Sequence, residues 1–573
     1  MKHFSKKRSI AALALATALL LTACAGGGDD VVNEAALSEN DALIAEAVKN
    51  QQLPFVSEGQ KISLELGVGA SANVTDFETN KFSLWLEEKT GLDLQFKVYQ
   101  GLSDNLKVSF AAGDTAIPDV IMNWNVDDGF LVKYGVEGEG MFVDLGPYMD
   151  EYGYNLKNAI DYSKNYKVEQ RRVDIEKWLV SSDGHRYFMP YIVQQEGNVY
   201  SGKAYINKVW LDKLGLKMPT TTEELKTVLR AFVNNDPNGN GKKDELGITG
   251  AKGHYRGAPW AFIMNSFIYE DQSRHYVVDQ ETGKLSLGYM QPEFKEGLKY
   301  INSLVKEGLY DVEAFSQDTT ALKTICNLEN NIVGLITTGS PDALFTSKPE
   351  RMLDYVALPN PIGPKGVNWA FRQARDVRVN GTMTKYCEDR LAGFALMDFM
   401  LSEEASIFAR YGEEGTDWRK ATDADVPMFA NIGLPARIVP ILGYGIPQNS
   451  HWQASNPQFR FPEIADGMAI DASKANEVNG EKIKADAITA YYGKAPEKIV
   501  EKQLFTLEEN DEFSELSAQI TACVSPTIAA FITGEKDIDK EWNAFQKELK
   551  DLGVDRYLEL SQISYDRFEK GVN

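Results

Sequence analysis

The most chemically suggestive stretch of the sequence is the loop "NNDPNGNGKKDELG", residues 234–247. Oxygen-bearing side chains at loop positions 1, 3 and 5 can surround one point, glycine at position 6 allows a sharp turn, and position 7 offers its backbone carbonyl. This pattern suits a hard cation and favours calcium over magnesium. The predicted metal ligands are Asp236, Asn238, Asn240, Lys242 through its carbonyl, Asp244 and Glu245.

The loop departs from an EF-hand at its end. Position 12 is Gly247, so the closing bidentate glutamate is missing there, and Asp244 and Glu245 come early instead. The same residue types also build turns without any metal, which is the alternative. If the metal binds, we expect a structural Ca²⁺ site that fixes a helix end and performs no chemistry.

Tryptophans in loop-like stretches are the second group of candidates, because sugar rings present apolar faces that stack on aromatic rings while polar side chains bind their hydroxyls. Packing in a core is an equally good explanation for each of these tryptophans, and the sequence does not decide which of them line a site. The candidate ligand-binding residues are Trp124, Asp128, Trp260, Trp369, Arg372, Trp418 and Trp452.

Motifs of catalysis are absent from the sequence. There is no HExxH, GxSxG, Walker A or GxGxxG pattern. Cys326, Cys387 and Cys523 contain no CxxC pair, which argues against a zinc or redox site, and they allow either one disulfide or three buried thiols. We therefore predict that the protein is not an enzyme, although its 83 acidic residues leave the carboxylate pair of a glycosidase open.

The N-terminus predicts export. A basic start is followed by an apolar run, residues 10–21, which has the length of a signal peptide and is too short to span a bilayer. The next residues, "LTAC", resemble a bacterial lipobox, in which Cys24 carries diacylglycerol and palmitate. The alternative is an ordinary secretory signal that happens to contain a cysteine. We expect a lipoprotein on the extracytoplasmic face of the cell membrane, anchored at Cys24 by lipid alone.

Length and charge set further limits. The 573 residues, 43% of them hydrophobic, suggest two or three domains or lobes with large cores. The formal net charge of −23 disfavours nucleic acid as a partner. The same acidic balance favours neutral over acidic oligosaccharides, unless a local basic patch overrides it.

The elements that would position these residues alternate between strands and helices. Strands are expected at 61–70, 92–101 and 117–125, with helices at about 80–90 and 104–114 between them. This order implies a parallel sheet, whose ligands bind beyond the carboxyl ends of its strands. Further along, Thr221 and Glu224 form a capping-box pattern before an amphipathic helix.

Several segments in one order resemble a known family. They are the lipobox, "YINKVWLDKLGLKMPTTTEEL", the Asp/Asn/Gly loop, "QPEFKEGLKYINSLVKEGLYDVEAF", "RYGEEGTDW" and the helical C-terminus. Together they resemble family-1 extracellular solute-binding lipoproteins, the carbohydrate receptors of ABC importers, including LipO-like proteins and alginate-oligosaccharide receptors. The resemblance covers the chain from about Lys61 onward.

The resemblance implies an α/β, two-lobed periplasmic-binding-protein-like fold of type II with a ligand cleft between the lobes. We expect a signal peptide at 1–23 and an acidic tether at 24–60. Lobe 1 would comprise 61–206 plus about 365–410, and lobe 2 would comprise 207–364 plus about 411–573.

The implied function is that of a monomeric receptor, which has a structural Ca²⁺ site, binds an oligosaccharide in the cleft between the lobes and delivers the sugar to ABC permease subunits. The alternatives are a lipid-anchored sensor or adhesin, or a carbohydrate-active enzyme. The sequence names neither the sugar nor the permease.

Overall fold

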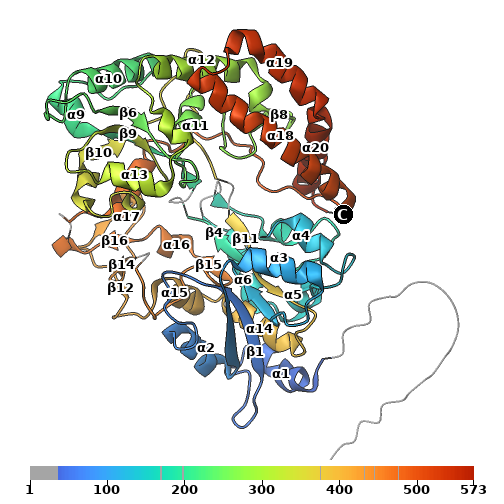
Figure 1. Ribbon diagram of the computed structural model, residues 1–573. Coiled ribbons are helices and arrows are strands. Elements are labelled where there is room, and N and C mark those ends of the chain that lie inside the picture. Colours follow the sequence, from blue (N-terminus) through green and yellow to red (C-terminus); the bar gives the residue numbers. More distant parts are fainter. Residues whose placement is uncertain are drawn as a thin grey trace, which may run out of the picture.

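The computed structural model describes residues 37–572 except 125, 168–170, 196–198, 374–375, 431–432, 444–445 and 475–476. The expected signal peptide and Cys24 lie outside these residues. Two sheets, each with its own hydrophobic core, form two lobes (Figure 1). The predicted two-lobed α/β architecture is thus confirmed.

The first lobe is built on a six-stranded sheet in the order β15-β4-β11-β3-β1-β2. β1 runs parallel to β2 and β3, whereas β11 lies antiparallel between β3 and β4. The strands are β1 (Ser63–Gly69), β2 (Asp93–Tyr99), β3 (Val120–Met122), β4 (Phe188–Val193), β11 (Asp376–Met383) and β15 (Gln458–Arg460).

Helices cover both faces of this sheet, and local signals set their ends. In α2 (Lys81–Thr90), the Asn80 side chain accepts a hydrogen bond from Phe82 N (3.0 Å), and Gly91 ends the helix at φ 76°. The sequence predicted both ends. The other helices of this lobe are α1 (Glu39–Lys49), α3 (Leu102–Ala112), α4 (Asp128–Lys133), α5 (Gly146–Tyr152), α6 (Tyr154–Lys164), α7 (Ile175–Leu179), α14 (Arg390–Phe399), α15 (Glu403–Tyr411) and α16 (Pro462–Ala465).

Residues 39–56 correct the predicted tether. α1 packs on α5 and α14, and Ile44, Val48 and Phe55 are buried in the core of the first lobe. Asp41 accepts hydrogen bonds from the backbone N–H groups of Leu391 and Ala392 (2.9 and 3.0 Å). These N–H groups belong to the first turn of α14 and have no partner within the helix. The folded part of the chain therefore begins before residue 60.

The second lobe is built on a four-stranded sheet in the order β10-β5-β9-β6, with β6 parallel to β9. Its strands are β5 (Ala204–Asn207), β6 (Leu246–Thr249), β9 (Val333–Thr337) and β10 (Tyr355–Ala357). Its helices are α9 (Lys208–Lys213), α10 (Thr222–Asn234), α11 (Pro259–Met264), α12 (Pro292–Lys306), α13 (Thr319–Cys326) and α17 (Gly480–Ile488). Short 3₁₀ turns are η2 (Gly288–Met290), η3 (Val312–Phe315), η4 (Pro341–Ala343), η5 (Pro349–Asp354) and η7 (Ala472–Lys474).

Three two-stranded sheets complete the fold, β7–β8, β12–β14 and β13–β16. Their strands are β7 (Tyr276–Val278), β8 (Leu285–Leu287), β12 (Trp418–Lys420), β13 (Val426–Pro427), β14 (Ile438–Pro440) and β16 (Ala469–Ile470).

The predicted capping box begins α10. Thr221 Oγ1 accepts from Glu224 N (3.2 Å), and the Glu224 carboxylate accepts from Thr221 N (3.3 Å). Leu225, Leu229 and Phe232 form the buried face of the helix. α10 ends at Asn234, where the predicted metal loop begins.

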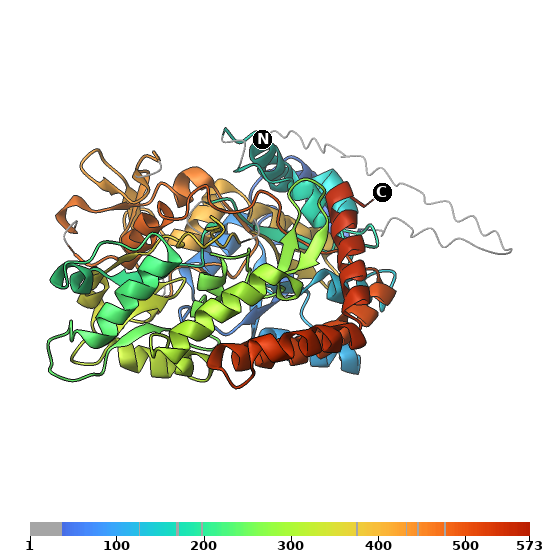
Figure 2. The same cartoon turned by 90° about the horizontal axis from the view of Figure 1, so that it is seen from above.

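The C-terminus consists of α18 (Leu507–Thr533), α19 (Ile538–Asp551) and α20 (Val554–Lys570), which follow one another around the outside of the molecule (Figure 2). α18 is long and apolar enough to span a bilayer by length and composition alone, but a core helix of a soluble protein meets the same criterion. It packs on α12, where Asn302 Nδ2 donates to Ile532 O (3.0 Å). The ring of Phe568 in α20 contacts Trp178 of the first lobe.

Strand pairing corrects two of the expected lobe boundaries. Residues 204–206 belong to β5 in the second sheet, although they were assigned to the first lobe. β15 at 458–460 pairs with β4 in the first sheet, although it was assigned to the second lobe. Both corrections depend on long-range pairing, which a local pattern does not reveal. We propose that the chain crosses between the lobes at 194–203, at 358–375 and again after β15.

Candidate ligand cleft between the two sheets

The topology brings one edge of each sheet toward the other. In the first sheet, the last residue of β4, Val193, pairs with the first residue of β11, Asp376. The carboxyl ends of β1 and β3 lie at the same edge of this sheet. In the second sheet, β5 begins and β10 ends at the edge where β6 and β9 have their carboxyl ends. Two crossing segments join these edges, and ligands of open α/β sheets bind at such edges.

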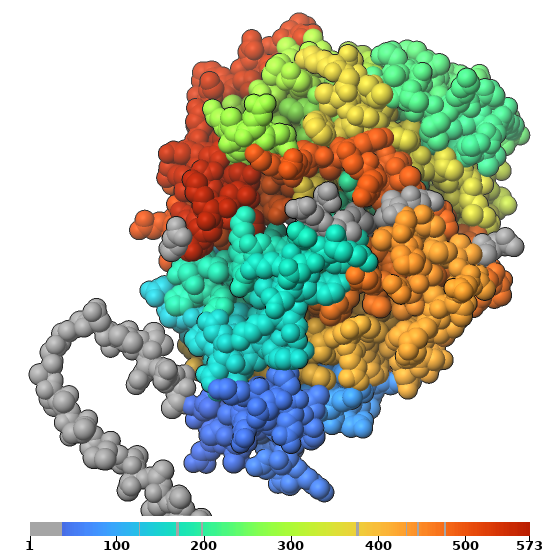
Figure 3. All heavy atoms as spheres, turned by 180° about the vertical axis from the view of Figure 1, so that it is seen from behind, coloured from blue at the N-terminus to red at the C-terminus, as the bar shows by residue number. Residues whose placement is uncertain are grey.

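In the space-filling view, the blue and cyan atoms of the first lobe lie below the green and yellow atoms of the second (Figure 3). Orange segments from the last third of the chain lie between them. The junction of the lobes is therefore the candidate ligand cleft.

The wall formed by the first lobe carries arginines among tyrosines. Arg460, at the end of β15, is buried and donates to the hydroxyls of Tyr191 (3.4 Å) and Tyr411 (3.3 Å). Burial alone raises the pKa of Tyr191, but Arg460, Arg410 and Arg378 around it lower the pKa below its ordinary value. This edge of the first sheet is therefore a positively charged environment.

The wall formed by the second lobe contains two residues of the loop that follows β6, Tyr255 and Arg256. Tyr255 is 53% exposed, and its hydroxyl donates to Gln373 Oε1 (3.3 Å) on a crossing segment. Arg256 adopts φ 59°, its guanidinium lies 3.8 Å from the centroid of the Phe371 ring, and its Nε donates to Ser201 Oγ (3.2 Å). A loop of the second lobe is thus tied to two of the three proposed crossing segments, 194–203 and 358–375.

Two of the predicted ligand-binding tryptophans are core residues instead. Trp124 is 0% exposed and packs against Phe110, Phe130 and Phe142. Trp452 is also 0% exposed, and its indole N–H donates to Ser83 Oγ (3.0 Å). Neither ring presents a face to a sugar, because neighbouring aromatic side chains from other elements cover them.

Three further candidates are buried or already bonded within the protein. Asp128 is buried 3.5 Å from the Lys502 ammonium, which lies just before α18. The Trp418 indole N–H donates to Gly412 O (3.0 Å). Arg372 forms an ion pair with Glu501 (2.9 Å) and ties a crossing segment to the C-terminal region. These contacts favour structural roles for all three.

Trp260 and Trp369 keep part of their surface exposed. Trp260 begins α11 and contacts the rings of His275 and Phe294. Trp369 lies on the crossing segment before β11, and its backbone N–H donates to Asn265 O (2.9 Å). Of the predicted tryptophans, these two remain candidates for stacking on a ligand.

The predicted metal loop folds around its own acidic and amide side chains. The Asp236 carboxylate accepts from Asn240 N and Gly241 N, both at 3.0 Å. The side-chain amides of Asn238 and Asn240 both donate to Asp244 at 3.1 Å. Side chains expected to share one cation therefore converge in the structure.

Glu245 provides the test of whether this loop fits a cation. Its carboxylate is buried, and neither of its oxygens has a hydrogen-bond partner among the described residues. Burial raises the pKa of Glu245, and the nearby charges of Asp244 and Asp236 raise it further. A divalent cation would satisfy these oxygens and remove the repulsion, so the residues present fit calcium.

A second acidic group was not predicted. Glu270, Asp271 and His275 have potential metal-ligand atoms within 4.8 Å of one another. However, Asp271 Oδ1 accepts backbone hydrogen bonds from the next turn, among them one from His275 N (2.8 Å), and His275 Nδ1 lies 2.9 Å from Glu270 Oε2. Burial lowers the pKa of His275, but the Glu270 carboxylate outweighs this and raises it. These groups stabilise a turn beside Trp260.

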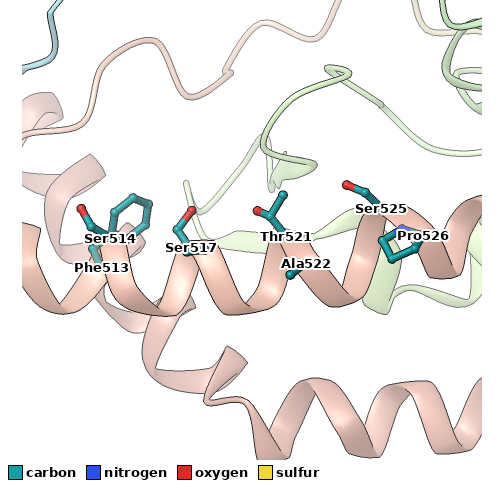
Figure 4. A pocket seen from close by; sticks show the side chains of 8 residues that line it. Phe513, Ser514, Ser517, Thr521, Ala522, Ser525 and Pro526 are labelled. Carbon is teal, nitrogen blue, oxygen red and sulfur yellow. The ribbon is translucent and has the colours of Figure 1, made fainter. Parts of the chain in front are cut away.

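A groove of about 650 Å³ follows α18 and not the strand ends (Figure 4). Ser514, Ser517, Thr521 and Ser525 line one face of the helix, with Phe513 at one end. The groove is formed by one helix alone and contains no charged side chain, so it lacks the features of a sugar site. Cys326, Cys387 and Cys523 are free thiols in the structure, which excludes a disulfide between them, but only Cys326 and Cys387 are buried, whereas Cys523 is partly exposed.

No protein-family model matches the sequence. Among curated proteins, the chain is 27% identical over 505 residues to the fructooligosaccharide ABC transporter substrate-binding protein FusA of Streptococcus pneumoniae, covering 85% of this chain and 87% of FusA. It is also 27% identical over 236 residues to lipoprotein LipO of Bacillus subtilis, covering 41% and 42% of the two chains.

Solved structures agree with this result. FusA of S. pneumoniae in complex with kestose superposes with a TM-score of 0.67 at 25% identity, covering 89% of this chain and 99% of FusA. An EF-hand mutant of FusA in complex with fructo-nystose gives a TM-score of 0.68 at 24% identity and the same coverage. The fold of this chain is that of the two-lobed solute-binding proteins. The resemblance predicted from the sequence, to the substrate-binding lipoproteins of ABC transporters, is confirmed.

Several cleft residues were missed by the sequence analysis, among them Lys203, Tyr255, Arg256 and Arg460. Lys203 directly precedes β5 and Arg460 is the last residue of β15, and both strands were assigned to the wrong lobe. Tyr255 and Arg256 belong to the loop "HYRG" after β6, and the only signal for them was its position after the end of a strand.

Proposed function

We propose that the protein is the substrate-binding receptor of an ABC importer, which binds an oligosaccharide in the cleft between its lobes and delivers it to a membrane permease. The proposal rests on one feature of the fold: crossing segments join the edge of the first sheet where β4 ends to the edge of the second sheet where β5 begins. The chain is also similar to FusA along most of its length. FusA is by name a fructooligosaccharide-binding protein, so an oligosaccharide ligand, without its charge or its monosaccharides, is inferred for this chain by similarity.

The mechanism follows from the arrangement of the two walls. A sugar that contacts both lobes at once favours the closed arrangement over the open one by its extra contacts. Tyr255, Arg256, Trp260 and Trp369 would contribute from the second lobe and the crossing segments, and the Arg460 region would contribute from the first. Binding alone is required of the protein, because the permease and its ATPase would be separate chains.

The experiment is uptake of labelled oligosaccharides by the source bacterium with and without this gene. A receptor is required for uptake of at least one sugar, and the intact gene restores it. The purified protein should return that sugar unchanged after prolonged incubation. Cleavage of the sugar would indicate the enzyme alternative, whereas unchanged uptake in the deletion strain would favour a sensor or adhesin.

We also propose that Asp236, Asn238, Asn240, Asp244 and Glu245 hold a structural Ca²⁺, together with the carbonyl of Lys242. The buried, unpartnered carboxylate of Glu245 supports this proposal, and so does the similarity to FusA, of which an EF-hand mutant is known. The ion supplies positive charge at the end of α10. The loop side chains then orient that helix end against the second lobe.

The proposed location is the extracytoplasmic face of the cell membrane, where lipid at Cys24 anchors the mature chain. We propose that the protein is a monomer. The similarity to lipoprotein LipO supports the anchor. Replacing Cys24 by alanine should release the protein from the membrane fraction, and mass spectrometry of the native N-terminus should detect the acyl chains.

A further inference from the structure

Lys203 is a buried lysine directly before β5, on the cleft-facing edge of the second sheet. Its backbone carbonyl accepts a hydrogen bond from Thr338 N (3.1 Å), which places the residue beside the end of β9. Only 2% of Lys203 is exposed. Among the residues that the structure describes, its ammonium has no hydrogen-bond or ion-pair partner. A buried ammonium without a partner is unfavourable, which suggests that a ligand supplies one.

The charges facing Lys203 do not compensate it. Lys484 and Glu481 face it from α17, and Arg256 faces it from the loop after β6. The Glu481 carboxylate already lies 2.6 Å from the Lys484 ammonium, and Asp342 lies 3.9 Å from the same group. Lys203 and Arg256 therefore remain as two cations at one sheet edge without an acidic partner among the described residues.

Arg256 is held in a fixed position. Its guanidinium packs on the Phe371 ring at 3.8 Å and on the Tyr255 ring at 5.5 Å from the centroids, and Nε donates to Ser201 Oγ. The terminal N–H groups of a guanidinium in such a position can bind a carboxylate with both oxygens. The two aromatic rings fix the group without neutralising its charge.

We infer that Lys203 and Arg256 bind a carboxylate on the ligand, so that the oligosaccharide is an acidic one. This inference rests on the proposed sugar-binding function and narrows it. It reverses the preference for neutral sugars that the net charge of −23 suggests, because the charge next to the ligand is locally positive. The acidic side chains elsewhere on the surface are screened by salt, whereas a contact in the cleft is screened much less.

The protonation of Lys203 provides an independent signature. Burial lowers its pKa to about 7, and the charges of Lys484 and Arg256 act in the same direction. A bound carboxylate favours the protonated ammonium and raises the pKa again. Binding of an acidic sugar near pH 7.5 should therefore take up protons, and its affinity should fall as the pH rises above 7.

The test is calorimetric titration of the purified protein with paired acidic and neutral oligosaccharides: galacturonate against galactose trimers, mannuronate against mannose trimers, and sialyllactose against lactose, the same sugar without its acidic unit. Lys203→Met and Arg256→Gln are compared with Lys306→Met, which removes an exposed lysine on α12 and is the control for net charge. Titrations in buffers of different ionisation enthalpy measure the proton uptake.

We expect at least one acidic sugar to bind to the wild-type protein. Lys203→Met and Arg256→Gln should each weaken this binding at least tenfold, whereas Lys306→Met should not. The proton uptake that accompanies binding should be lost in Lys203→Met. Binding of neutral sugars only would overturn the acidic inference and leave the receptor function standing. Equal affinity of Lys203→Met and wild type for the acidic sugar would also overturn it. No binding of any sugar would count against both proposals.

Discussion

At the scale of single residues, burial decides which charged groups are available for function. Lys203 is a case in which stability and function oppose each other, because its charge is unfavourable in the folded protein without a ligand. Its folded pKa of about 7 lies below the unfolded value, so the unfolded chain binds more protons between pH 7 and about 10.5. The free energy of unfolding therefore rises with pH across this range.

We predict that Lys203→Met stabilises the ligand-free protein at pH 6 by an amount on the order of 4 kcal/mol or less, since the methionine side chain buries similar volume without charge. The gain should be largest below pH 7 and should shrink as the pH rises toward 10. Urea denaturation at several pH values measures it. A variant less stable than wild type at pH 6 would show that the ammonium has a stabilising partner.

Trp124 and Trp369 should respond in opposite ways to truncation. We predict that Trp124→Ala lowers the free energy of unfolding by about 3–5 kcal/mol, because it leaves a cavity among Phe110, Phe130 and Phe142. Trp369→Ala should cost less stability but weaken sugar binding. Denaturation and calorimetry on both variants separate the two effects, and a loss of affinity with unchanged stability in Trp124→Ala would reverse the assignment.

Glu245 tests the metal site. Calcium should raise the Tm of the wild-type protein over EDTA, because an ion that binds only the folded state stabilises it by mass action. In Glu245→Gln this calcium-dependent shift should largely disappear. In EDTA the variant should be at least as stable as wild type, since its buried side chain carries no charge. An equal calcium shift in both proteins would place the ion elsewhere.

At the scale of elements, α1 is part of the fold and not of a tether. We predict that a chain beginning at residue 59 is less stable than one beginning at residue 37 by several kcal/mol. It loses the burial of Ile44, Val48 and Phe55, each worth about 1.5–3 kcal/mol, and leaves the first N–H groups of α14 without Asp41. Urea denaturation of the two chains measures the difference. Equal stability of the two chains would contradict this account and support the original prediction of a tether up to residue 60.

The elements that sequence predicts best are those with local signals. Asn80 and Gly91 mark the ends of α2, and Thr221 with Glu224 marks the start of α10, because caps act within one helical turn. β5 and β15 were assigned to the wrong lobes because their sheet partners lie far along the chain. The ends of β1 and β3 were predicted to form a binding edge, which stays a prediction, and the side chains now proposed to line it were not predicted.

The candidate site was predictable only in part, and for the same reason. The six predicted metal-loop residues are close in sequence, so the hydrogen bonds among Asp236, Asn238, Asn240 and Asp244 follow from spacing. Trp124 follows β3 and Trp452 lies in a polar loop, so both look like cleft residues in the sequence, but aromatic side chains from other elements bury them. Lys203 looks like an ordinary surface lysine until α17 and the loop after β6 are placed over it.

At the scale of the whole molecule, the C-terminal region connects the two lobes. Lys502 lies 3.5 Å from Asp128 of the first lobe and donates to Trp178 O (2.9 Å), and α18 then runs onto α12 of the second lobe. Arg372 and Glu501 tie the same region to a crossing segment. Any change in the angle between the lobes must occur with these contacts in place, so we expect closure to bend the crossing segments.

The central claim is that a sugar binds between the lobes and brings them together. Small-angle X-ray scattering of the purified protein, with and without a saturating concentration of an oligosaccharide that calorimetry shows to bind, tests this claim most directly. We predict that the radius of gyration falls when the sugar is bound, while the molecular mass stays that of one chain and the sugar is recovered intact. An unchanged radius of gyration with the sugar bound would contradict closure around a ligand in the cleft.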